Sequence, residues 1–118
     1  MPAARRRPVL HIRLNLTPAV GFGPGKADLL ERLAETGSIS AAAKAMKMSY
    51  RRAWLLLEEL NRSFRQPVAV KTKGGRGGGG GATLTPWGRT VLKHYRTIEA
   101  KAQRAAGPLI AALRRNLG

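Results

Sequence analysis

The sequence lacks cysteine, and it has only 5% aromatic residues and six acidic residues among its 118 positions. Without cysteine the chain can form no disulfide, thiolate metal site or cysteine nucleophile, and this absence fits a cytoplasmic protein. Two histidines, His11 and His94, have no partner at ligand spacing. So few titratable groups leave little for acid–base chemistry. We therefore expect a protein that is not an enzyme and has no cofactor.

Long apolar runs are missing as well. No segment approaches the roughly 20 residues of a membrane span, and the residues after Arg5–Arg7 alternate in polarity, unlike a signal peptide. The glycine run contains a nucleotide-binding pattern only trivially, because no helix opens directly after it. The sequence thus predicts neither a membrane protein nor a nucleotide-binding one.

Positive charge is abundant. Lysine and arginine number 22, which gives a formal net charge of +16, while 43% of the residues are hydrophobic and can build a core. A folded domain with this charge needs a polyanionic partner. Nucleic acid is the first candidate and an anionic membrane surface the second.

The first half of the chain predicts a strand and three helices. Residues 10–16 alternate as in a half-buried strand, and residues 17–25 form a turn-rich connector. Helical spacing begins near Lys26 and stops at Gly37. Ser38 opens a short second helix that ends near Met46. Ser49 caps a third helix, which Pro67 terminates.

The second half predicts a hairpin and a long helix. Residues 68–73 and 82–84 favour strands, and seven of the 14 glycines lie between them. Thr85 and Pro86 begin a long amphipathic helix that runs to about Ala106. Gly107-Pro108 breaks it, before one or two final helical turns.

This order of elements predicts an α+β winged helix-turn-helix, with an N-terminal strand, a glycine-tipped wing hairpin and a long C-terminal helix. Residues 1–8 are expected to be a flexible basic arm. Residues 9–118 are expected to form the DNA-binding domain, including a C-terminal dimerisation helix.

Basic residues concentrate where such a fold meets DNA. Residues 44–76 contain nine basic and two acidic residues. Arg51 and Arg52 lie in the first turn of the third helix, which enters the major groove, and arginine can bond a guanine edge through two hydrogen bonds. The alternative is that both belong to a solvated face.

Other residues near this turn and hairpin are candidates for DNA contacts. Ser38 and Ser40 could bind a phosphate at the second helix's N-terminus or simply cap it. The hydroxyl of Tyr50 could reach DNA, or its ring could pack in the core. The predicted DNA-binding residues are Ser38, Ser40, Lys44, Lys47, Ser49, Tyr50, Arg51, Arg52, Lys71, Lys73 and Arg76.

Several segments resemble the molybdate-responsive repressor (ModE) family and, more distantly, the N-terminal domain of LysR-type regulators. The similar segments are Gly37–Lys44, Met48–Trp54, Gly74–Gly80, Ala82–Thr85 and Trp87-Gly88. Together they place the resemblance over residues 10 to about 103.

This resemblance implies a homodimer that binds double-stranded DNA at a near-palindromic site, with its recognition helix starting at Ser49. Dimerisation would use the long helix and terminal segments, and we expect it to involve Leu92, Tyr95, Ile98, Leu109 and Leu113. Family members that sense the oxyanion have a C-terminal molybdate-binding domain, whereas this sequence stops at Gly118. Molybdate or tungstate sensing is therefore not supported by this chain.

We expect a bacterial, cytoplasmic, sequence-specific transcription regulator in a single-domain form. Another input, a sensing partner or a longer parent chain would account for the missing effector domain. Two alternatives stay open: a nonspecific architectural or RNA-binding basic protein, and a dimerisation partner of a two-domain regulator.

Overall fold

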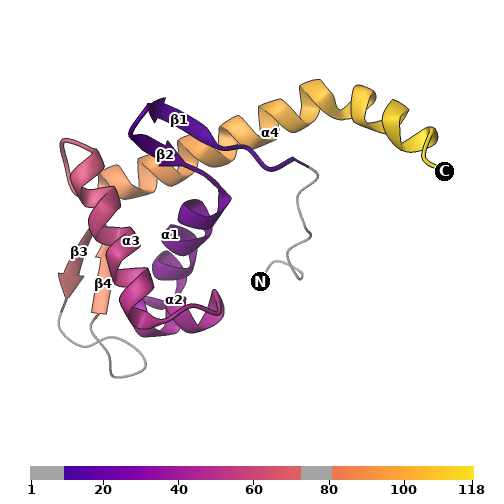
Figure 1. The fold of residues 1–118 in the computed structure, drawn as a ribbon. Coiled ribbons are helices and arrows are strands. Elements are labelled where there is room, and N and C mark those ends of the chain that lie inside the picture. The colour runs from indigo at the N-terminus through magenta and orange to yellow at the C-terminus, as the bar shows by residue number, and fades with distance from the viewer. Residues whose placement is uncertain (1–9, 73–80) are drawn as a thin grey trace.

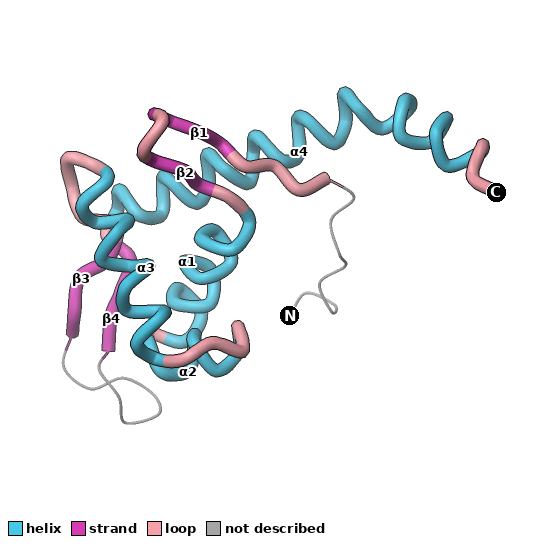
Figure 2. The backbone as a smooth tube through the Cα atoms, viewed as in Figure 1, coloured by secondary structure: helices cyan, strands magenta, loops and turns pink. Residues whose placement is uncertain are grey.

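A computed structural model describes residues 10–72 and 81–118 of the chain, and these form a helical body with two small antiparallel hairpins (Figures 1 and 2). Within these residues the α+β winged helix predicted from the sequence is confirmed. In chain order the elements are β1 (Leu14–Thr17), β2 (Val20–Phe22), α1 (Pro24–Thr36), α2 (Ile39–Ala45), α3 (Tyr50–Ser63), β3 (Ala69–Thr72), β4 (Gly81–Leu84) and α4 (Pro86–Arg115).

The predicted helix boundaries rest on local capping. Gly37 ends α1 in a left-handed conformation with φ of 67°, which glycine adopts without steric cost. The hydroxyls of Ser38, Ser49 and Thr85 each accept a backbone N–H in the first turn of α2, α3 and α4. These caps fix where each helix begins.

The core lies between α1, α2 and α3 and is closed by the β3–β4 hairpin and the first half of α4. Aliphatic side chains dominate it, as the scarcity of aromatics predicts. Its largest fully buried hydrophobic members are Tyr95, Leu29, Leu30, Leu33, Ile39, Leu60 and Val68. No described helix is long and apolar enough to cross a membrane.

The predicted wing hairpin is present. β3 pairs with β4 in antiparallel register, from Ala69 opposite Leu84 to Thr72 opposite Gly81. Asn61 of α3 ties the hairpin to the helix: its side-chain oxygen accepts the Val68 N–H at 2.8 Å, and its amide donates to the Ala69 carbonyl oxygen at 3.1 Å. These bonds attach the base of the hairpin to α3.

The N-terminal region differs from the prediction. The strand covers Leu14–Thr17 instead of residues 10–16, and the expected connector contains a second strand, β2, which pairs with it. The Thr17 hydroxyl accepts the N–H groups of Ala19 and Val20, so a tight turn forms where glycines and prolines indicated only a loop. Leu16 is exposed and does not continue the inward face.

The ends of the third and fourth helices also differ. α3 ends at Ser63, with Phe64 already extended, four residues before Pro67. α4 continues through Gly107 and Pro108 to Arg115. A proline inside a helix removes its own N–H bond to the carbonyl four residues earlier and its ring crowds that carbonyl, but on an exposed surface the helix can bend slightly and water can satisfy the carbonyl.

Tyr95, which was predicted to lie at a dimer contact, is buried within its own chain in this structure. Its side chain is only 1% exposed, its ring packs 5.1 Å from that of Phe22, and its hydroxyl donates to the Ile12 carbonyl oxygen at 2.6 Å. Burial raises the pKa of Tyr95 to about 12. The residue therefore attaches the N-terminal segment to α4 within one chain.

Arg96 fixes α4 against α1. Its guanidinium contacts Asp28 and Glu31 at 2.7 Å each and Glu99 at 2.9 Å. Burial alone would lower the pKa of Arg96, but hydrogen bonds to the three carboxylates raise it above the ordinary arginine value. This cluster holds the long helix in place across the back of the domain.

Candidate nucleic-acid interface

A short turn between α2 and α3 creates the geometry of the site. The Met46 N–H donates to the Ala42 carbonyl oxygen, the Lys47 N–H to that of Lys44 and the Met48 N–H to that of Ala43. Lys47 adopts a left-handed conformation, with φ of 57°. The chain therefore reverses within a few residues and presents α3 directly after α2.

Helix α3 has an inward and an outward face. Ala53, Leu57 and Leu60 are buried in the core, whereas Arg51 and Arg52 are exposed. Tyr50, for which both a DNA contact and core packing were left open, is 40% exposed and lies at the start of the helix. Its hydroxyl is thus open to a ligand, so the predicted DNA contact stays open as well.

The exposed cations form a group with no acid among them. Residues 44–52 contain four basic and no acidic residues, and all four basic side chains are exposed: Lys44, Lys47, Arg51 and Arg52. Within residues 10–72 and 81–118, none of the four side chains has a hydrogen bond or ion pair. Their charges are available to an outside anion.

The predicted serine contacts divide into two cases. Ser38 is 0% exposed, and its hydroxyl accepts the Ala41 N–H at 3.0 Å, so it is a cap and its side chain is not accessible to DNA in this structure. Ser40 is half-buried. Ser49 is exposed while it caps α3 through the Arg52 N–H at 3.1 Å.

The wing contributes one described cation. Lys71 of β3 is exposed, and its ammonium lies 4.0 Å from the centre of the Trp54 ring on α3. This cation–π contact links the wing to the recognition helix. Trp54 is correspondingly half-buried. Lys73 and Arg76, both predicted contacts, lie outside the described residues, as do Arg5–Arg7.

These features share one end of the molecule. The first turn of α3 and the open ends of β3 and β4 lie together at the bottom of Figure 1, and α4 crosses the opposite side before extending past the body. The structure therefore brings together the predicted turn, helix and wing residues that it describes.

The predicted dimer residues are spread along α4. Leu92 is half-buried and packs against its own core. Ile98 is exposed, and Leu109 and Leu113 are 71% and 72% exposed. Only the distal members therefore offer an open apolar surface.

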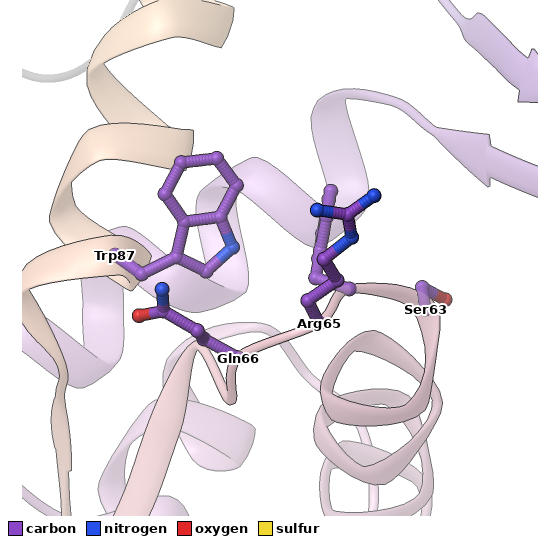
Figure 3. A pocket seen from close by; sticks show the side chains of 5 residues that line it. Ser63, Arg65, Gln66 and Trp87 are labelled. Carbon is purple, nitrogen blue, oxygen red and sulfur yellow. The ribbon is translucent and has the colours of Figure 1, made fainter.

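Sequence patterns did not reveal two features of this region. The Lys71–Trp54 contact joins residues 17 positions apart, and no spacing rule predicts it. A hollow at the far end of α3 is lined by Ser63, Phe64, Arg65, Gln66 and Trp87 (Figure 3). The Trp87 ring nitrogen is buried there without a hydrogen-bond partner among the described residues. Across residues 10–72 and 81–118, no group of acidic and histidine side chains could hold a metal ion.

The chain is similar to several curated proteins. It is 37% identical to the molybdenum transport protein ModE of Azotobacter vinelandii over 79% of this chain and 35% of that protein. It is 41% identical to the molybdenum-pterin-binding protein MopB of Rhodobacter capsulatus, over 67% and 29% respectively. It is 33% identical to the DNA-binding transcriptional dual regulator ModE of Escherichia coli, over 80% and 36%.

These matches confirm the resemblance to ModE-type proteins, and the matched region spans only about a third of each relative. The family of bacterial regulatory helix-turn-helix proteins of the LysR type matches residues 26–89. That range runs from α1 to the start of α4 and includes the turn, the recognition helix and the wing. The chain therefore belongs to the LysR-type family of bacterial regulatory helix-turn-helix proteins.

Proposed function

We propose that this chain binds double-stranded DNA sequence-specifically and regulates transcription as a homodimer at a near-palindromic site. The supporting observation is the exposed pair Arg51 and Arg52, unpaired within the described residues, in the first turn of a helix whose start is fixed by Ser49. Such a turn docks in the major groove, where a guanidinium can distinguish guanine from other bases.

Each group has a separate role in this proposal. Lys44 and Lys47 attract the phosphate backbone without regard to sequence, while the α3 arginines contact base edges. Lys71, held against Trp54, places the wing beside the same duplex. With ~4 phosphates neutralised per protomer, a dimer should show a log–log salt slope of about −7.

This chain is proposed to bind DNA, and no effector is proposed for it. Two relatives carry names that refer to molybdenum or a molybdenum pterin, but the match covers only 35% and 29% of those proteins. Residues 9–118 are proposed as the DNA-binding domain with its dimerisation helix, in a cytoplasmic, non-enzymatic protein. Residues 1–8 are proposed as a flexible basic arm.

Selection of bound duplexes from a random pool tests the proposal. The expected result is an enriched inverted repeat, because two symmetry-related α3 helices contact two half-sites. Competition with shuffled duplex and structured RNA should show that the chain binds the selected duplex at least about a thousand-fold more tightly, the lower end of the usual range for specific binding.

Other outcomes would favour other functions. Similar affinities for the selected duplex, the shuffled duplex and RNA would indicate an architectural or RNA-binding protein. A monomeric chain that fails to bind DNA even at low salt would indicate a module that pairs with a two-domain regulator.

A further inference from the structure

Leu55 lies on the outward face of α3. It is 48% exposed, although its neighbours two positions away, Ala53 and Leu57, are buried in the core. Two residues along an α-helix turn the side-chain direction by about 200°, so Leu55 points away from the domain. A single exposed leucine is ordinary on a protein surface, and its meaning depends on the residues around it.

Cations surround this leucine on the side of the helix start. Leu55 follows Arg51 by four residues, so the two side chains are neighbours on one helical stripe. Arg52 lies in the same first turn, and Lys44 and Lys47 are exposed in the preceding helix and turn. An apolar side chain thus stands beside the two arginines of the first turn of α3, at helical spacings of three and four residues.

The two acidic residues that follow Leu55 on α3 each have a basic partner other than Arg51 and Arg52. A Glu58 carboxylate oxygen lies 4.0 Å from an Arg62 guanidinium nitrogen in the next turn of α3. A Glu59 oxygen lies 3.3 Å from the Lys26 ammonium, on the side of α1. The surface around Leu55 is therefore suited to a polyanion.

A second copy of this chain is a poor occupant for the same surface. Packing Leu55 against its own counterpart would bring the Arg51 and Arg52 side chains of both copies close together, and like charges at close range are unfavourable. Duplex DNA supplies the opposite charge. In the major groove, the thymine C5-methyl group is the only apolar feature of the base edges.

We infer that Leu55 is a specificity-determining residue that contacts a thymine methyl group in each half-site. This inference rests on the proposed function. Leu55 lies one turn further along α3 than Arg51, so the thymine should be displaced along the groove from the base pair that Arg51 contacts.

Replacing thymine by deoxyuridine at single positions of the selected duplex tests the inference, because this change removes only the methyl group. For the wild-type chain we expect one position in each half-site to lose affinity about four-fold, the effect of burying one methyl group. For Leu55→Ala, the same replacement should have no effect.

Leu16→Ala is the matched control, since Leu16 is equally exposed but lies on the N-terminal hairpin. It should retain the wild-type response to deoxyuridine. Circular dichroism and sedimentation should show that both variants keep the wild-type helix content and oligomeric state.

The inference is overturned if the wild-type chain prefers the selected duplex yet tolerates deoxyuridine at every position; the proposed function then stands. It is also overturned if Leu55→Ala changes the oligomeric state and keeps the deoxyuridine response. If the chain prefers no duplex over another, the proposed function itself fails.

Discussion

Arg51 and Arg52 are exposed because Ser49 fixes the start of α3 and the buried residues of that helix fix its rotation. Both facts could be predicted from the sequence: serine is a favoured cap, and apolar residues recur at helical spacing. Ser38 was also predicted correctly as a cap, but its burial was not predicted. Its hydroxyl caps α2 while fully buried, and burial depends on packing that the spacing of residues does not specify.

Lys47 provides a test of backbone attraction without base recognition. We predict that Lys47→Ala weakens binding to selected and shuffled duplex equally and makes the salt slope shallower by about 0.9 per protomer. Lysine and alanine tolerate the left-handed φ at this position similarly, so the change isolates the charge. Lys101→Ala, on the exposed side of α4, should leave the slope unchanged. Losses confined to the selected duplex would contradict this role.

Tyr95 gives the protein a specific response to alkaline pH. Burial raises the pKa of Tyr95 to about 12 in the folded chain, against roughly 10 when unfolded. Between these values the folded state retains a proton that the unfolded state has released, so the free energy of unfolding falls as pH rises. This stabilisation is complete below pH of about 10.

Tyr95→Phe should remove this response. At neutral pH the variant should be less stable by about 1 kcal/mol, because the hydrogen bond to Ile12 is lost. From pH of about 10 to 12, urea unfolding experiments should show that the free energy of unfolding of the wild-type chain approaches that of the variant. A difference that stays constant across this window would show that Tyr95 does not titrate as described.

At the scale of elements, local signals predicted most boundaries and tertiary contacts set the rest. The helix-turn-helix pair and the wing follow from caps, spacing and turn residues within a few positions of each other. The β1–β2 hairpin was missed because its signal, the Thr17 hydroxyl bonding to two following N–H groups, resembles that of a loop. The long helix was expected to end at about Ala106, before Gly107-Pro108, since proline usually terminates a helix, but α4 continues to Arg115.

The junction between β3 and α4 depends on a glycine. A Cβ added to Gly88 would overlap the carbonyl oxygen of Val68, which already accepts the Thr85 N–H at 2.9 Å. We predict that Gly88→Ala lowers the free energy of unfolding by about 1–3 kcal/mol, as overpacking typically does. Thermal unfolding followed by circular dichroism measures this change.

Gly107→Ala is the opposite case within the same helix. A Cβ at Gly107 would meet no atom within 4 Å, and alanine favours the helical conformation more than glycine does. The free energy of unfolding of this variant should therefore rise by about 0.5–1 kcal/mol. If the two variants were equally stable, the close approach of α4 to the wing would be contradicted.

At the scale of the whole molecule, the two halves of α4 have different surroundings. Its first half is fixed to the body by Tyr95 and Arg96, and its second half extends beyond the body with Leu109 and Leu113 on one face (Figure 1). The sequence indicated the apolar character of both halves. It could not distinguish intrachain packing of Tyr95 from a dimer contact, because burial in one chain and burial between chains select the same residue types.

We predict that the double variant Leu109→Asp, Leu113→Asp is monomeric in sedimentation experiments. Opposed carboxylates would replace apolar contacts at the proposed interface, and affinity for the inverted repeat should fall at least ten-fold while a single half-site binds as before. The variant Leu16→Asp, at an exposed leucine of the β1–β2 hairpin, should remain dimeric. A dimeric double variant would place the interface elsewhere.

The most direct test of the account is a titration of Arg51→Ala and Arg52→Ala against the selected duplex and a shuffled one at equal salt. If these arginines contact base edges, each variant should lose about 1–3 kcal/mol of the difference in binding free energy between the two duplexes. Its affinity for the selected duplex should fall far more than its affinity for the shuffled one. Equal losses on both duplexes would show that the two arginines bind only the phosphate backbone and that α3 does not recognise sequence through its first turn.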